Sequence, residues 1–342
     1  MTAIAIAPVR DTTLAAPAER LSVLDGWRAV SILLVLAGHL LPLGPSRWEM
    51  NKAIAAMGMV IFFTLSGFLI TRFLSRGADL RVFIIRRFFR IVPLAWVVMV
   101  LLLIVNQSPE KAWAANLLFY ANLPPFNLVA GGWHLWSLCV EVQFYLGIGL
   151  FVMVARQRGL ILLPLFAVGI TLLRIVDHQY INVVTWYRVD EILAGGILAL
   201  VHGGWYGTRP QSVLAAISPY WMLPLVLLSA HPAGGFLNFA RPYLAAMLVG
   251  ATLFNGPVRL GRLLESRPAR YIAEISYALY IFHGALNAGW LGSGSTFVKY
   301  AKRPLLLAVT FALAHVSTFR FEQPCIALAK RLTRGIAIKA PA

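Results

Sequence analysis

Residues 26–40, GWRAVSILLVLAGHL, place two side chains suited to chemistry, Arg28 and His39, in an almost continuous apolar run. A helix turns by about 100° per residue, so the steps from Arg28 to His39 amount to about 1100°, within about 20° of three turns, and span about 16 Å. The two side chains therefore share one helix face. Asp25 falls within about 60° of both, although its position at the helix start favours a role as an N-terminal cap.

The imidazole of His39 is well suited to accept a proton near neutral pH. Ionisable residues inside long apolar helices usually face a bundle interior or a wet cavity, which makes the shared face of Arg28 and His39 a candidate site. The alternative is structural, with Arg28 reaching lipid phosphates and His39 lying at the opposite membrane surface. Apolar residues that continue past His39 disfavour this alternative for the histidine.

A second cluster of cations lies in RVFIIRRFFRIVPLAW, residues 81–96, which contains Arg86, Arg87 and Arg90. Arg87 and Arg90 are three residues apart, so they are neighbours on one helix face. Planar guanidinium groups suit a clamp for the phosphates of a nucleotide-like cofactor. Binding of anionic lipid next to a membrane helix explains the same residues equally well.

Glu141 lies in GGWHLWSLCVEVQFYLG, residues 131–147, one to two turns inside an apolar helix and close to Trp136 and Tyr145. An unpaired carboxylate is costly there. We therefore expect Glu141 to be partnered by Arg28, by His39 or by an arginine of the run at 81–90.

Two further ionisable residues are supporting candidates. Asp190 lies at the mouth of an apolar segment that follows a polar, aromatic loop. His283 belongs to ISYALYIFHGALN, where Ser276, Tyr280, His283 and Asn287 are spaced to form one polar stripe along a helix. Such residues often join helices in membrane bundles, so this spacing favours a structural role for His283.

The elements that must position these residues are membrane helices. The chain of 342 residues is 59% hydrophobic and 13% charged, whereas charged residues normally approach a quarter of a soluble domain. A crossing needs about 20 apolar residues. The apolar runs predict an all-α, polytopic membrane bundle of about ten transmembrane helices, at residues 23–43, 54–74, 91–106, 135–155, 159–176, 189–203, 213–229, 242–256, 272–291 and 304–321.

The distribution of positive charge supports this topology. With ten crossings and both termini cytoplasmic, eighteen of the 30 lysines and arginines fall in cytoplasmic segments and seven in the opposite loops, as the positive-inside rule predicts. The net charge of +17 is thus explained mostly by topology, and nucleic acid is not an expected partner.

The predicted organisation has three parts. Residues 1–20 are rich in Ala, Pro and Thr and predict a disordered cytoplasmic tail, residues 21–332 form the transmembrane domain, and residues 333–342 form a cytoplasmic C-terminal tail. Cys139 and Cys325 lack metal-ligand spacing, so we interpret both as packing residues and expect no metal.

Taken together and in order, these motifs resemble the integral-membrane acyltransferase 3 family, which includes bacterial O-acetyltransferases of surface glycans. The resemblance rests on six segments. They are LDGWRAVSILLVLAGHL, FFTLSGFLITRFL, RRFFRIVPLAW, WSLCVEVQFYL, SYALYIFHGAL and FRFEQP.

The resemblance implies transfer of an acyl group, commonly acetyl from acetyl-CoA, to a hydroxyl of a carbohydrate or lipid-linked glycan at the bacterial cytoplasmic membrane. It gives His39 the role of the essential first-helix histidine, as general base or acyl acceptor, and Arg28 that of its arginine partner. Arg87 and Arg90 match the third-helix pair, with Arg86 beside them, and Glu141 matches the fourth-helix acid.

A different class of protein would also bury charges in a membrane bundle, namely a transporter or flippase of a glycan or lipid without acyl transfer. Many transporters contain a repeated half, and we see no internal repeat at a fixed period in this sequence. A single basic entrance with an imidazole further along the same helix face favours the acyltransferase.

Overall fold

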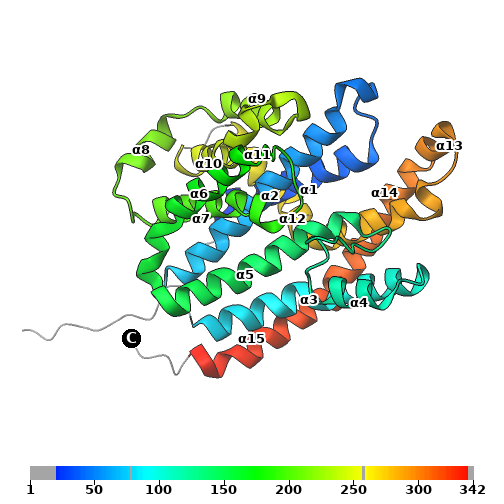
Figure 1. Ribbon diagram of the computed structural model, residues 1–342, viewed down its shortest axis with the longest axis horizontal. Coiled ribbons are helices and arrows are strands. Elements are labelled where there is room, and N and C mark those ends of the chain that lie inside the picture. The colour runs from blue at the N-terminus through cyan, green and yellow to red at the C-terminus, as the bar shows by residue number, and fades with distance from the viewer. Residues whose placement is uncertain (1–20, 78, 256–258, 338–342) are drawn as a thin grey trace, which may run out of the picture.

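A computed structural model describes residues 21–77, 79–255 and 259–337, and within these residues the chain forms helices and turns without strands. Figure 1 shows the helices gathered into one bundle. Their bounds are α1 Ser22–Leu40, α2 Met50–Leu74, α3 Leu80–Val105, α4 Glu110–Leu117, α5 Trp136–Ala155, α6 Leu163–Val176, α7 Asp190–His202, α8 Arg209–Ala216, α9 Pro219–Ala230, α10 Leu237–Phe254, α11 Arg259–Leu264, α12 Arg267–Ala288, α13 Thr296–Ala301, α14 Arg303–Ser317 and α15 Gln323–Ala337.

Seven helices within the described residues are long and apolar enough to cross a membrane. They are Ser22–Leu40, Met50–Leu74, Leu80–Val105, Trp133–Ala155, Gln157–Val176, Leu237–Phe254 and Arg303–Ile336. The number is eight if the bent pair α8 and α9 forms one crossing. An all-helical fold with several potential membrane helices is thus confirmed, whereas the number ten and the side of the termini stay predictions.

Two of the expected helices are shorter or less regular than their apolar runs suggested. Helix α7 has 13 residues and is only about 20 Å long. The run at 213–229 is broken into α8 and α9, which meet at 89°. Pro219 begins α9, and the residue before a proline is held out of the helical conformation, which explains the break.

Other boundaries lie outside the predicted ranges. Helix α3 begins at Leu80, where Asp79 accepts a hydrogen bond from the Arg81 backbone N–H, so the arginine run is part of the helix and not a loop before residue 91. Helix α14 continues through a π-helical turn, Thr318–Glu322, into α15, which ends at Ala337 and so passes the expected boundary at 332. The expected tail at 1–20 and the last five residues of the expected tail at 333–342 lie outside the described residues.

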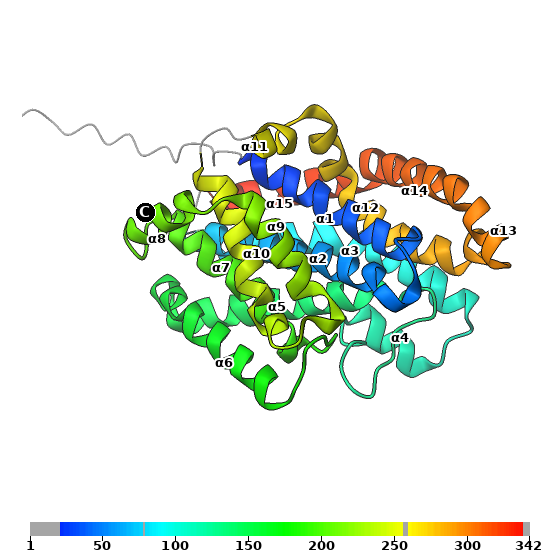
Figure 2. The same cartoon turned by 90° about the horizontal axis from the view of Figure 1, so that it is seen from above.

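Helix α2 is the centre of the bundle and packs against α1 and α7. Close approach depends on glycine, because a Cβ on Gly67 of α2 would overlap the Ile192 carbonyl of α7, and a Cβ on Gly195 of α7 would overlap the Thr64 carbonyl of α2. Small residues at such crossings let helix backbones pack closely in membranes. Figure 2 shows α6 on one margin of the bundle, away from α13 and α14.

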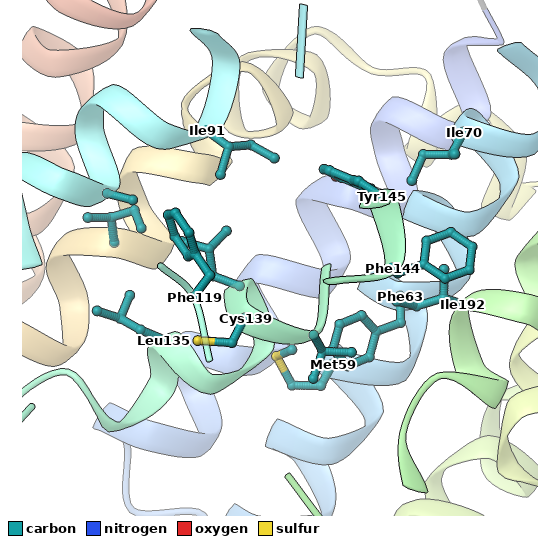
Figure 3. Close-up of a cluster of buried hydrophobic side chains, with 14 of the residues drawn as sticks. Met59, Phe63, Ile70, Ile91, Phe119, Leu135, Cys139, Phe144, Tyr145 and Ile192 are labelled. Atoms are coloured by element: carbon teal, nitrogen blue, oxygen red, sulfur yellow. The ribbon is translucent and has the colours of Figure 1, made fainter. Parts of the chain in front are cut away.

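The apolar core divides between two clusters that share α1, α2 and α7. The larger cluster joins them to α3, α5 and α12, and the second joins them to α9 and α10. Figure 3 shows part of the larger cluster, with Met59 and Phe63 of α2 beside Cys139 and Phe144 of α5. Cys139 is fully buried there, in agreement with its expected packing role. Helices α1, α3, α5 and α12 are therefore held together at one core.

Candidate active site

The arginines of α1 and α3 line a cavity inside the bundle. This inner cavity includes about 760 Å³ of space not filled by protein atoms, part of it open to solvent. Arg28, Arg87, Arg90 and Glu141 lie on its wall, together with apolar side chains of α1 and α2. Arg28 of α1 and the predicted pair of α3 thus line one cavity, whereas His39 is not part of its wall.

Two further pockets adjoin the inner cavity at these arginines. One is lined by Arg28, Arg87, Arg90, Arg86 and Lys330. The other is lined by Arg28 and Arg90 together with Asp25, Arg267 and Arg270. We call Arg28, Arg87 and Arg90 the open arginines, because each lines at least two of the three spaces.

No ion pair with a carboxylate is found for the open arginines within residues 21–77, 79–255 and 259–337. Arg87 lies over the ring of Tyr145, with its guanidinium carbon 5.3 Å from the ring centroid. Arg86 differs, because its Nε donates a hydrogen bond of 3.1 Å to Thr333 Oγ1 of α15. Figure 1 shows α15 lying alongside α3, where the two helices pack together.

Glu141 is buried, and the prediction of its direct partner was wrong. Its Oε1 accepts hydrogen bonds from the hydroxyls of Ser66 on α2 and of Tyr145 one turn along α5. Arg28 and Arg90 line the same cavity without an ion pair to it. The distance between α2 and α5 cannot be inferred from the sequence, so the Ser66 hydroxyl was not expected as a partner of Glu141.

Tyr280 of α12 and Ser137 of α5 line the inner cavity near the outer pocket described next. Their hydroxyl oxygens are 2.6 Å apart, and the Tyr280 hydroxyl also donates to the backbone carbonyl of His134. The Tyr280 ring packs against His134 and His283, with ring centroids 5.2 and 5.7 Å apart. Tyr280 therefore contacts both the inner cavity and a histidine cluster.

His39 lies in a separate outer pocket with His134, His283, Trp133 and Trp136. Its side chain is exposed, and its Nδ1 is 3.0 Å from His283 Nε2. His134 also packs against His283, with ring centroids 4.6 Å apart. We call His39, His134 and His283 the histidine cluster. His283 contacts the proposed catalytic histidine directly, which the expected structural role had not included.

Asp190 lines neither the inner cavity nor the outer pocket. Its Oδ2 is 2.5 Å from Arg174 Nη1, and neighbouring Glu191 pairs with Arg241 at 2.9 Å and with Arg188 at 3.3 Å. We call these five residues of α6, α7, α10 and the adjoining loop the ion-pair cluster. Arg188 alone approaches the site, with its guanidinium carbon 5.2 Å from the ring centroid of Trp136.

Sequence reasoning missed several residues of the two cavities. Ser66 and Ser137 gave no signal, because small hydroxyl residues are common in membrane helices. His134 was not among the predicted site residues, although it shares the outer pocket with Trp133 and Trp136. Lys330 was considered only as one of the positive charges that support the predicted topology. In the structure it lines the pocket of Arg86, Arg87 and Arg90.

A family model described as an acyltransferase domain matches residues 21–319, and the chain therefore belongs to this family of acyltransferases. The chain is similar to the peptidoglycan O-acetyltransferase OatA of Listeria monocytogenes, with 27% identity over 87% of the chain and 54% of that protein. It is also similar to the putative peptidoglycan O-acetyltransferase YrhL of Bacillus subtilis, with 28% identity over 76% of the chain and 47% of that protein.

A putative O-acetyltransferase of Staphylococcus aureus is 23% identical over 77% of the chain and 50% of that protein. The chain thus spans about half the length of the curated relatives it matches. No solved structure matches it.

Proposed function

We propose that this protein is a membrane O-acyltransferase that moves an acetyl group from acetyl-CoA to a hydroxyl of a cell-wall or surface glycan. The observation that carries the proposal is the arrangement of two neighbouring spaces. Three open arginines line the inner cavity, and Tyr280 lines that cavity and contacts His134 and His283 of the histidine cluster. The names of the relatives, which are peptidoglycan O-acetyltransferases, support a glycan as acceptor.

The side chains at the arginine end fit the phosphates of a coenzyme A thioester. Guanidinium groups without a carboxylate partner keep their hydrogen-bond donors available, and paired N–H donors match phosphate oxygens. Arg28, Arg87 and Arg90 are the residues that would hold these phosphates. The mostly apolar wall of the inner cavity, with Ile32, Val35 and Leu138, suits a long and weakly polar pantetheine arm.

Acyl-CoA, when bound, supplies an acyl group activated as a thioester. In the proposed reaction, an acceptor hydroxyl lies in the outer pocket and gives its proton to His39. The hydroxyl oxygen forms the new ester bond, the bond between the acyl carbon and sulfur breaks, and the proton passes to the departing thiolate. In the alternative sequence, His39 first receives the acyl group and then transfers it to the hydroxyl.

Glu141 has a supporting role in this proposal. Its carboxylate is held by Ser66 and Tyr145 in the cavity that Arg28 and Arg90 also line. Electrostatic attraction from the Glu141 carboxylate orients the side chains of Arg28 and Arg90, although neither forms an ion pair with it. Asp25 and Trp136, which line neighbouring pockets, limit the space available to the two substrates.

The test is acetyl transfer by the purified full chain in lipid nanodiscs, with acetyl-CoA and soluble peptidoglycan fragments. Release of free thiol and the mass gain of the acceptor by one acetyl group are measured together. We expect His39→Ala to lower kcat by about a hundredfold or more, the usual contribution of a general base. His315→Ala is the matched control, because His315 is an exposed histidine of α14. Full activity of the His39→Ala protein would overturn the assignment.

A further inference from the structure

The contact between His39 and His283 has the geometry of a hydrogen bond in the ring planes. The two rings are nearly parallel, at 8°, and their centroids are 5.2 Å apart, whereas His39 Nδ1 and His283 Nε2 are only 3.0 Å apart. The two nitrogens can be that much closer than the ring centres only if each lies on the edge that faces the other ring. One of them therefore donates an N–H to the other.

The backbone of α12 decides which nitrogen donates. His283 Nδ1 is 2.7 Å from the carbonyl oxygen of Tyr280, and a carbonyl oxygen can only accept. His283 Nδ1 therefore carries the hydrogen. A neutral imidazole has one N–H, so His283 Nε2 offers a lone pair toward His39.

His283 is held in its neutral form by its surroundings. Its side chain is 1% exposed, and no ion pair with a carboxylate is found for it within the described ranges 21–77, 79–255 and 259–337. A buried charge without such a partner is costly. With Nε2 of His283 as acceptor, the donor of the 3.0 Å contact is His39 Nδ1.

His134 is held by the same helix and leaves this arrangement intact. Its Nε2 is 3.2 Å from the carbonyl oxygen of Ile281, so that nitrogen carries the hydrogen of the neutral ring. Consecutive carbonyls of α12, those of Tyr280 and Ile281, thus fix the hydrogens of two histidines. A Cβ on Gly284 would overlap the His134 ring, so a glycine at this position is needed for the close approach.

We propose that His283 is a positioning residue that fixes His39 in the Nδ1–H tautomer and leaves His39 Nε2 as the proton-accepting atom of the outer pocket. The Tyr280 carbonyl determines which nitrogen of His283 carries the hydrogen, and His283 in turn determines which nitrogen of His39 does. A ring nitrogen is commonly chosen for its task by the hydrogen bond that the other nitrogen makes. The catalytic consequence rests on the proposed function, whereas the tautomer assignment does not.

Two substitutions separate this role from simple packing. His283→Phe keeps a ring beside His39 but removes the acceptor nitrogen. His283→Gln removes the ring but can place its amide oxygen, an acceptor, where Nε2 now lies. A packing role predicts that Phe is the better replacement, and a positioning role predicts that Gln is. Size-exclusion profiles and apparent melting temperatures of both proteins check that they fold.

The first readout is a long-range proton–nitrogen NMR spectrum of the protein labelled with ¹⁵N-histidine, in detergent at a pH where the imidazoles are neutral. The His39→Ala protein identifies the His39 signals. We expect the Nδ1–H form of His39 in the parent protein and in His283→Gln, and a mixture of forms in His283→Phe. An Nε2–H form in the parent, or an unchanged form in His283→Phe, overturns the proposal.

The second readout is acetyl transfer by the same proteins. We expect kcat to fall by about tenfold in His283→Phe, with an unchanged KM for acetyl-CoA, and to be largely retained in His283→Gln. Equal losses in both variants overturn the positioning role. If the parent protein shows the Nδ1–H form but does not transfer acetyl groups, the proposed function fails while the tautomer assignment stands.

Discussion

Two groups of arginines lie within this helical bundle, and they differ in what neutralises them. In the ion-pair cluster, Arg174, Arg188 and Arg241 are 0–3% exposed and pair with Asp190 and Glu191. The open arginines line cavities and have no such pair within the described residues. A count of charges in apolar segments would rank both groups alike. Guanidinium donors that are not paired with a carboxylate remain available to a ligand. This difference separates a candidate binding site from an ion-pair cluster with a structural role.

The comparison is tested most strongly by removing one acid of the ion-pair cluster. Asp190→Ala leaves Arg174 as an uncompensated buried charge, and breaking such a pair costs about 3–5 kcal/mol of folding free energy. We expect a large loss of folded protein and a lower apparent melting temperature, measured by fluorescence-detected size-exclusion chromatography after heating. Asp177→Ala is the matched control, because Asp177 is exposed. Equal apparent melting temperatures of the Asp190→Ala and parent proteins would show that the ion-pair cluster does not stabilise the fold.

The open arginines should behave in the opposite way. Charge reversal by Arg87→Glu with Arg90→Glu is expected to weaken acetyl-CoA binding by at least about tenfold, because a hydrogen bond to a charged group contributes about 1.5–3 kcal/mol. Calorimetry on the detergent-solubilised protein measures the affinity, and melting should change little. Arg81→Glu is the matched control on the same helix, since Arg81 is exposed. Unchanged affinity in the double variant would return Arg87 and Arg90 to lipid binding.

The smallest effect is expected at the surface pair of Asp79 and Arg81, at the start of α3. Hydrogen bonds from the side chain and backbone N–H of Arg81 lower the pKa of Asp79 below its ordinary value of 3.8. A lowered carboxyl pKa contributes stability above the ordinary value, and this contribution disappears as pH falls through the folded-state pKa. We expect Asp79→Ala to cost about 0.5 kcal/mol, as for a lost helix cap. The difference from the parent, followed by melting, should shrink below about pH 4, and a constant difference would contradict this origin.

The sequence predicted best what depends on neighbours along one helix. Helical phase predicted a shared face for Arg28 and His39 and another for Arg87 and Arg90, because about 3.6 residues per turn fixes which side chains lie together. Arg28, Arg87 and Arg90 line the inner cavity, and His39 lines the outer pocket. The apolar runs likewise located most helices. They missed the break before Pro219 and the early start of α3, because hydropathy averages over the cap and proline that set those ends.

What the sequence could not give was the pairing of distant helices. His39 and His283 are separated by 244 positions, and Arg241, assigned by topology to an outer loop, pairs with Glu191 inside the bundle. Periodicity tells which face a residue occupies and not which helix covers that face. The same gap made a cation the expected partner of Glu141, whereas Ser66 and Tyr145 bind it.

The continuous helix Arg303–Ile336 has 34 residues and is about 50 Å long, well beyond the roughly 30 Å of a hydrocarbon core. A helix of this length exceeds what one crossing perpendicular to the membrane needs. Its last turns carry Lys330, Arg331 and Arg334, cations that favour the headgroup layer. Lys330 also lines a pocket with the open arginines. A position of these cations at the headgroup layer would leave that pocket accessible to a water-soluble anion, as the proposed function requires.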